Sequence, residues 1–182
     1  MRSLRRNQNR KRTKLRKTSR RTPKKKGGHT LQNIGLEVRY PSGIVRGQTF
    51  TKDETNGVPQ VFFEPKQGKL YTLLMWDPDA LAKPSWIHWI VTNLETPEQV
   101  PQKIVLSYQG PNPPSGVHKY IFGLFEQIHG KISPMISGVA MFKTKATAST
   151  TLSGVRGGFD YKGFIEQNGL KQITSVYFTV KA

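Results

Sequence analysis

Short alternations of apolar and polar residues dominate the chain after residue 30 and predict a mainly β fold. These runs are rich in Val, Ile, Trp, Tyr and Phe, and Pro, Gly or Asp-Pro turn signals bound most of them. Many short strands with little helix favour a sandwich or barrel over a parallel α/β sheet. The expected strands are Leu36–Tyr40, Gln60–Glu64, Tyr71–Trp76, Trp86–Asn93, Lys119–Gln127 and Thr174–Lys181.

Two segments near the C-terminal end break this β pattern. A helix is expected over Tyr161–Asn168, because Gly169 supplies a stop signal directly after it. The stretch Lys143–Gly158 is rich in Thr, Ser, Gly and Ala, which predicts a long surface loop. Among the remaining aromatic residues and histidines, we interpret Phe142, Phe159 and Phe164 as core or loop anchors, and His29 and His129 as exposed residues without an assigned role.

Basic residues are concentrated at the N-terminal end of the chain. Residues 1–26 hold 14 Lys and Arg and no acidic residue, whereas the remainder holds 15 basic and 11 acidic residues. A segment with so much like charge and so few large apolar side chains cannot bury a core. We therefore expect a disordered basic arm at residues 1–28 and one folded domain at residues 29–182. Such an arm either binds polyanions, such as nucleic acid or an anionic membrane, or is a tail of nuclear-localisation type.

The composition also limits the compartment and the kind of site. The arm has no apolar h-region, so it is not a secretory signal, and it lacks the apolar face of a transit peptide. No run approaches 18 apolar residues, so no transmembrane helix is expected. The absence of cysteine excludes disulfides and thiolate metal sites. We expect an intracellular protein, cytoplasmic or nuclear, that acts as a monomer.

Candidate chemistry begins where the Tyr71–Trp76 strand meets Asp77-Pro78-Asp79. Proline has no N–H and fixes φ, so the strand must stop there and leave Asp77 at its end. In one interpretation, both aspartates cap local N–H groups in a turn. In the other, the turn aims Asp77 into a site, and the residues alone leave both interpretations open.

A histidine interrupts the aromatic strand that follows. Side chains of a regular strand alternate between faces, so Trp86, His88 and Ile90 are expected on one side. A histidine in this setting needs a hydrogen-bond partner to offset the cost of its desolvation. It is therefore either a buried neutral residue or a donor that faces a pocket.

The segment from Tyr108 to Gly116 is dense in Pro and Gly and is expected to be a stiff loop. His118 and Tyr120 follow it and fall on one face of the next strand. The loop is either a simple connector or a rigid support that delivers both side chains to a preorganised polar site.

Three motifs in this order and spacing resemble the signature of the phosphatidylethanolamine-binding protein (PEBP) family. They are Asp77-Pro78-Asp79-Ala80, the Trp-x-His-Trp-x-Val-x-Asn run from Trp86, and the Gly-Pro-x-Pro-x-x-Gly-x-His-Lys-Tyr run from Gly110. The resemblance extends over roughly residues 33–181 and leaves the basic arm unmatched. It implies a PEBP-like β-sandwich with Greek-key-like connections, one or two short helices, and a small pocket for phosphate-like or carboxylate anions, including phospholipid head groups. Carried over by position, the ligand-binding residues are Asp77, Ala80, Trp86, His88, Gly110, Pro111, His118 and Tyr120.

The chemistry of these residues agrees with an anion pocket. Imidazoles, a phenol O–H and loop N–H groups are all donors that an anion accepts. A carboxylate at Asp77 suits an orienting role, because it fixes the tautomer of His88 or His118 by accepting from the ring. Anion binding is then expected to tighten as the pH falls toward about 6, near the unperturbed pKa of histidine.

The chain departs from the family pattern at the expected rim of the pocket. Leu81 stands where the family usually has proline, and a short loop precedes Trp86. The chain stops after its last strand, without the C-terminal helix that partly covers the pocket in animal members.

The motifs favour a non-catalytic regulatory module that binds an anion or a phospholipid head group. The chain has no Gly-x-Ser-x-Gly elbow, no phosphate-binding Gly-x-x-x-x-Gly-Lys loop and no His-Glu-x-x-His motif, and Ser115 lies in a flexible Ser-Gly step. We expect no enzyme activity, no cofactor and no metal, although Asp77 and two histidines could hold a metal. Two alternatives are an interaction protein that acts through the arm on nucleic acid or membrane, and an inhibitor of a protease or kinase. The family resemblance also implies a kinase, a protease or a transcription factor as partner.

Overall fold

The computed structural model describes residues 35–100, 104–133, 135–136, 139–140 and 156–182. The arm expected at residues 1–28, with His29, lies outside the described residues, as do Phe142 and most of the loop expected at Lys143–Gly158. The strands are β1 (Leu36–Tyr40), β2 (Gly43–Ile44), β3 (Thr49–Phe50), β4 (Gln60–Phe63), β5 (Tyr71–Asp77), β6 (Trp86–Leu94), β7 (Ile104–Leu106), β8 (Val117–Gln127), β9 (Met135–Ile136), β10 (Val139–Ala140) and β11 (Leu170–Lys181). The helical elements are the 3₁₀ turns η1 (Asp53–Thr55) and η2 (Pro97–Gln99) and the helix α2 (Tyr161–Gln167).

Six strands form the main sheet in the order β3-β11-β8-β5-β6-β7. Strands β5, β6 and β7 are successive antiparallel neighbours, and β8 then returns to pair with β5. The spatial order β8-β5-β6-β7 is that of a Greek key, in which the fourth strand lies beside the first. The Greek-key-like topology implied by the sequence is therefore confirmed.

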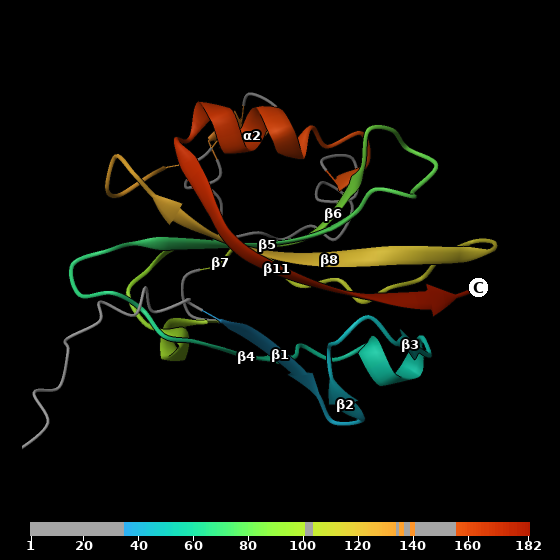
Figure 1. Ribbon diagram of the computed structural model, residues 1–182. Coiled ribbons are helices and arrows are strands. Elements are labelled where there is room, and N and C mark those ends of the chain that lie inside the picture. Colours follow the sequence, from blue (N-terminus) through green and yellow to red (C-terminus); the bar gives the residue numbers. More distant parts are fainter. Residues whose placement is uncertain (1–34, 101–103, 134, 137–138, 141–155) are drawn as a thin grey trace, which may run out of the picture. The chain divides into compact units, whose positions relative to one another are not determined.

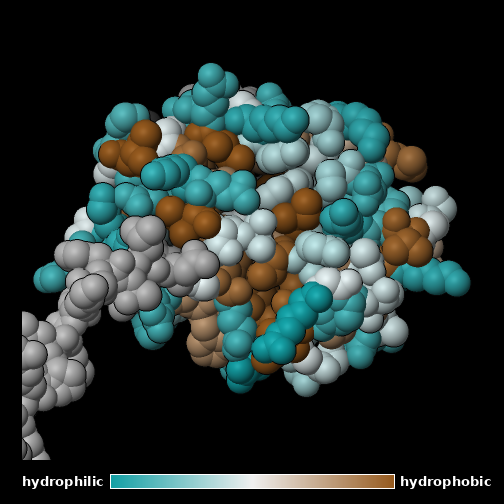
Figure 2. All heavy atoms as spheres, viewed as in Figure 1, coloured by the Kyte–Doolittle hydropathy of each residue, from teal (hydrophilic) through white to brown (hydrophobic). Residues whose placement is uncertain are grey.

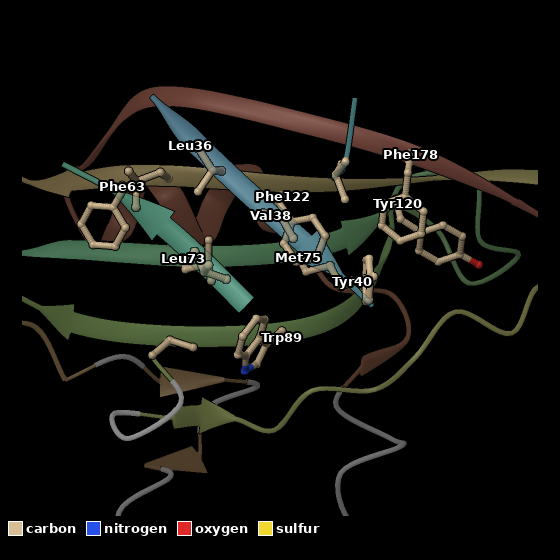
Figure 3. Packing of buried hydrophobic residues seen from close by; sticks show 14 of the residues in the cluster. Leu36, Val38, Tyr40, Phe63, Leu73, Met75, Trp89, Tyr120, Phe122 and Phe178 are labelled. Atoms are coloured by element: carbon tan, nitrogen blue, oxygen red, sulfur yellow. The ribbon is translucent and has the colours of Figure 1, made fainter. Parts of the chain in front are cut away.

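A smaller sheet of order β2-β1-β4 packs on one face of the main sheet and makes the fold a sandwich (Figure 1). Apolar side chains from both sheets meet between them, because strand residues alternate and one face of each sheet must be covered (Figure 3). Leu36 and Val38 of β1 face Leu73 and Met75 of β5 in this layer. The core therefore holds in place the strands whose ends carry the candidate site.

Helix α2 covers the opposite face of the main sheet (Figure 1). Its Phe164 packs with Phe159 into a second apolar cluster that includes Leu74 and Ile90 of the sheet. The Asp160 side chain caps the helix by accepting from the N–H of Gly163 at 3.0 Å. Gly169 follows the helix at φ +56, which an L side chain adopts only at a cost. The expected helix is confirmed, and Phe159 and Phe164 are buried as expected.

Irregularities in two strands overturn details of the regular alternation. In β6 the pairing with β5 shifts between Trp89 and Ile87, so His88 is an extra residue. Ile90 consequently packs in the cluster under α2, whereas Trp86 and His88 line a cavity, and the expectation of a shared face is wrong for Ile90. Strand β11 begins at Leu170 rather than at Thr174, because a second bulge after Gln172 hides its early alternation.

The face shown in Figure 2 is mostly hydrophilic, with apolar residues in patches among polar ones. Strand β5 is buried along its whole length, because one face meets the smaller sheet and the other meets the α2 layer. His129 is exposed, as expected from the sequence. No helix in the described part of the chain is long and apolar enough to cross a membrane.

Candidate functional site

A cavity of about 400 Å³ opens at the end of the main sheet where β5 ends and where β6 and β8 begin. Pro111 is buried and does not line the cavity, whereas the other seven predicted ligand residues do: Asp77, Ala80, Trp86, His88, Gly110, His118 and Tyr120. The lining also includes residues outside that prediction: Leu81, Ala82, Gln109, Asn112, Pro113 and Pro114. The structure therefore brings together the three sequence motifs from separate strands.

Asp77 is the last residue of β5, and its two carboxylate oxygens have different partners. Oδ2 lies 2.7 Å from Nδ1 of His118, and both side chains are buried. Oδ1 accepts from the backbone N–H of Asp79 at 2.7 Å. Asp79 in turn accepts from the backbone N–H of Lys119 at 2.8 Å. The turn interpretation and the orienting interpretation of Asp77 both hold, and its histidine is His118 rather than His88.

His88 takes its partner from the loop between β7 and β8. Its Nδ1 lies 2.7 Å from the carbonyl oxygen of Gln109, while the N–H of Gln109 donates to the His88 carbonyl at 3.0 Å. The Gln109 side chain also accepts from the indole N–H of Trp86 at 3.2 Å. Backbone and side-chain bonds therefore hold His88 and Gln109 in one mutual orientation.

Burial lowers the pKa of His88 to about 4, and the nearby charges of Arg156 and His118 lower the pKa further, against the opposing effect of the Gln109 carbonyl. His88 is consequently neutral at pH 6, so protonation of this residue does not account for a tightening of anion binding near that pH. Its ring meets that of Tyr120 edge-on, with the centroids 5.1 Å apart. Burial and the charges of Asp77 and Asp79 raise the pKa of Tyr120, so its phenol stays protonated.

Arg156 is a buried part of this region that the sequence did not reveal. Its guanidinium donates to the carbonyl oxygens of Ile87 at 3.1 Å, His88 at 2.9 Å and Ser107 at 2.7 Å. Burial lowers its pKa to about 10, which leaves the group charged at neutral pH. These carbonyl oxygens belong to β6 and to the residue just after β7, and they accept hydrogen bonds from a side chain instead of from a neighbouring strand.

The prediction of a surface loop over Lys143–Gly158 is wrong for Arg156 and Gly157. Arg156 is only 5% exposed, and Gly157 pairs with Trp86 through an isolated β-bridge. A Cβ on Gly157 would lie 3.1 Å from the Trp86 ring, so the close approach favours glycine. The partners of Arg156 are three main-chain carbonyls and, at 3.4 Å, the Ser107 hydroxyl, and main-chain partners leave no pattern in a single sequence.

A set of hydroxyl groups fastens the loop that carries Gln109. The Tyr108 hydroxyl donates to the carbonyl of Thr55 at 2.6 Å and lies 2.8 Å from the Tyr40 hydroxyl. A Cβ on Gly110 would lie 3.0 Å from both the Thr55 carbonyl oxygen and the Asn56 Cα. The loop is therefore seated on η1, which favours the rigid-support interpretation over that of a simple connector.

The outer edge of the cavity is apolar and open. Leu81, which replaces the proline usual in the family, lines the cavity and is 79% exposed, whereas the neighbouring Ala80 is buried. Within the described residues, no group of three His, Cys, Asp or Glu side chains could hold a metal ion.

Comparison with known proteins gives a family match and several relatives. A sequence model described as "Phosphatidylethanolamine-binding protein" matches residues 40–178. The chain is 30% identical over 101 residues to "Putative odorant-binding protein A5" of Drosophila melanogaster, a match that covers 50% of this chain and 48% of that protein. It is 37% identical over 75 residues to "Protein MOTHER of FT and TFL1 homolog 2" of Oryza sativa subsp. japonica, covering 38% and 43%. The matches therefore span less than half the length of these curated relatives.

Two solved structures resemble the chain over most of its length. One is a phosphatidylethanolamine-binding protein from Plasmodium vivax, with a TM-score of 0.65, 20% identity, and coverage of 81% of this chain and 85% of that one. The other is a carboxypeptidase Y inhibitor in complex with its cognate proteinase, with a TM-score of 0.58, 21% identity, and coverage of 81% and 82%. At these identities the likeness shows a shared fold and carries no inhibitory activity to this chain.

Proposed function

We propose that this chain, which belongs to the phosphatidylethanolamine-binding protein family, is a non-catalytic binding module whose cavity accepts a phosphate-like anion, such as that of a phospholipid head group. One observation carries the proposal: three residues that line the cavity each have a polar side-chain atom without a hydrogen-bond partner among the described residues. These atoms are Nε2 of His88, Nε2 of His118 and the hydroxyl oxygen of Tyr120. Buried polar groups in a folded protein normally have partners, so groups held open toward a cavity indicate a ligand.

The charges around the cavity support an anion rather than a cation. Asp77 carries the carboxylate nearest the histidines, and His118 and the Asp79 N–H already occupy its oxygens. The guanidinium of Arg156 binds the His88 carbonyl, and its partners among the described residues are neutral oxygens. A buried cation without a carboxylate partner adds a positive potential to its surroundings.

The geometry favours binding over catalysis. Ser115 is exposed, and no hydrogen bond joins its hydroxyl to His118 in the described part of the chain. His118 instead uses Nδ1 on Asp77, and His88 uses Nδ1 on a backbone carbonyl. An activated serine needs a base within hydrogen-bond reach, and this serine has none there.

Titration calorimetry with sodium phosphate at fixed ionic strength tests the proposal. The full chain is expected to show one saturable site. His129→Gln is the matched control for His118→Gln, because His129 is an exposed histidine outside the cavity. Phosphate affinity that is the same in the wild type and in His118→Gln would refute the proposal.

The charge of residues 1–26 favours a second function, exerted through the arm. With 14 basic residues and no acid, this segment is suited to nucleic acid or an anionic membrane. Deletion of residues 2–26 is expected to abolish binding to either polyanion and to remove its steep dependence on salt. Binding that survives the deletion, or that ignores salt, would contradict this second function.

A further inference from the structure

The tautomer of His88 follows from its hydrogen bond to the loop. A carbonyl oxygen only accepts, so the ring nitrogen that lies 2.7 Å from the Gln109 oxygen carries the hydrogen. The position of the Gln109 oxygen is restrained, because the N–H of the same residue is bonded to the His88 carbonyl and the adjacent Gly110 lies so near Thr55 and Asn56 that a Cβ there would be 3.0 Å from their backbone. The hydrogen of a neutral His88 ring is therefore fixed on Nδ1.

The other ring nitrogen of His88 is left for the cavity. The residue lines the cavity, and the structure shows no bond to Nε2 from the described residues. Nor is Nε2 among the side-chain atoms that are both fully buried and unpartnered, which in the described part of the chain are the indole nitrogens of Trp76 and Trp89. Nε2 therefore has access to the cavity and presents a lone pair to it.

The surroundings of His88 keep that lone pair free of a proton. From β8 it faces His118 and the phenol of Tyr120, and from behind the Arg156 guanidinium binds its carbonyl oxygen. The nearest carboxylate, Asp77 at the end of β5, is hydrogen-bonded to His118 instead. Burial, with the charge of Arg156, lowers the pKa of His88 to about 4, so Nε2 is an acceptor throughout the neutral range.

We propose that the cavity selects phosphate species that carry an O–H over oxyanions of equal charge that carry none, because Nε2 of His88 accepts a hydrogen bond from the ligand. This selectivity rests on the proposed anion binding and narrows it to inorganic phosphate and phosphate monoesters, such as the head group of phosphatidic acid, because a phosphodiester head group carries no O–H. An oxyanion without a hydrogen would set its own lone pairs against that of Nε2. The Tyr120 hydroxyl and the Asn112 amide, which also line the cavity, are the donors for the remaining oxygens.

Hydrogenphosphate and sulfate are the matched probes for this requirement. At about pH 8 both are dianions of nearly equal size, and they differ by one hydrogen. In calorimetric titrations of the full chain at equal ionic strength, we expect phosphate to bind at least about tenfold more tightly than sulfate. Equal or tighter binding of sulfate would overturn the selectivity and leave the anion site intact. Failure of both anions to bind would refute the anion site itself.

His88→Gln tests the residue assigned to the selection. A glutamine amide rotates to offer either its N–H or its carbonyl oxygen, so the ratio of the two affinities is expected to fall to within about threefold. A ratio that stays near tenfold in this variant would mean that another group selects the ligand. A long-range ¹H–¹⁵N spectrum of the ligand-free wild type supplies an independent check. A His88 ring with its hydrogen on Nδ1 alone supports the proposal, and a hydrogen on Nε2 overturns it.

Discussion

At the end of the main sheet opposite the cavity, Thr72, Asn93 and Gln127 form a polar group that we call the amide cluster. Oε1 of Gln127 accepts from the Thr72 hydroxyl and from the Asn93 N–H, both at 2.8 Å. Its Nε2 donates to Oδ1 of Asn93 at 3.0 Å and to the Gly130 carbonyl at 2.8 Å. At the cavity end, His88 and His118 each use one ring nitrogen and leave the other open.

The two ends therefore use similar burial for different purposes. Gln127 is 3% exposed and His88 is 4% exposed, so exposure alone does not tell them apart. All four hydrogen-bonding positions of the Gln127 amide are taken, which makes the amide cluster a fixed part of the structure. The histidines have spare capacity beside a cavity, which makes their end suited to a ligand.

The largest effect on stability is expected from a substitution in the amide cluster. Gln127→Ala removes four hydrogen bonds and leaves a void, and we expect it to lower the free energy of unfolding by about 4 kcal/mol. Phosphate affinity of the folded fraction should stay at the wild-type value, because the cluster lies at the far end of the sheet. Urea unfolding and calorimetry measure the two quantities. A loss below about 1 kcal/mol would show that the cluster is dispensable.

The pH dependence of stability is the next largest expected effect, and it comes from His88 at the cavity end. His88 titrates near pH 4 in the folded protein and near 6.5 when unperturbed, so below about pH 6.5 the unfolded chain takes up a proton that the folded protein does not. The contribution of His88 is complete above pH 6.5 and is lost as the pH falls toward 4, an expected loss of about 3 kcal/mol. Urea unfolding across this range should give a shallower slope for His88→Gln. His129→Gln should keep the wild-type slope, and equal slopes for all three proteins would contradict the burial of a neutral His88.

A smaller effect is expected where the loop is seated. A Cβ in Gly110→Ala would meet the backbone of Thr55 and Asn56 at 3.0 Å, and we expect a loss of about 2 kcal/mol in unfolding free energy. Phosphate affinity should fall as well, because the Gln109 carbonyl moves away from His88. Gly57→Ala is the control, since its Cβ would meet no atom within 4 Å. If both alanine variants are as stable as the wild type, the loop is not held by this contact.

The smallest change concerns one hydroxyl. Tyr120→Phe should leave the free energy of unfolding within about 0.5 kcal/mol of wild type, because the hydroxyl has no partner in the described structure. Phosphate affinity should fall about fivefold, since the ligand loses one donor. Tyr177→Phe, in an exposed ring, should change neither quantity. Unchanged phosphate affinity in Tyr120→Phe would remove this hydroxyl from the site.

Much of the fold was predictable because its signals are local. Alternating runs bounded by turn residues located β1, β4, β5, β6 and β8 to within a few residues. Gly169 located the end of α2, and the Asp-Pro step located the end of β5. The bulge at His88 was not predictable, because the extra residue is set by pairing with Met75 and Trp76 of the neighbouring strand.

The candidate site was predictable in its members but not in its bonds. His118 and Tyr120 alternate regularly along β8, so their common face followed from spacing. Which histidine meets Asp77 depends on how far β5, β6 and β8 are offset, and no single sequence states that offset. Arg156 escaped notice because a buried guanidinium that binds mainly main-chain carbonyls has no counterpart in the sequence pattern.

The most direct test of the open cavity end is a phosphate titration of the full chain followed through the ring signals of its histidines. The account predicts that the signals of His88 and His118 move together and saturate at one affinity, while the signal of His129 stays in place. Signals of His88 and His118 that do not move, or a His129 signal that moves as far as theirs, would contradict it.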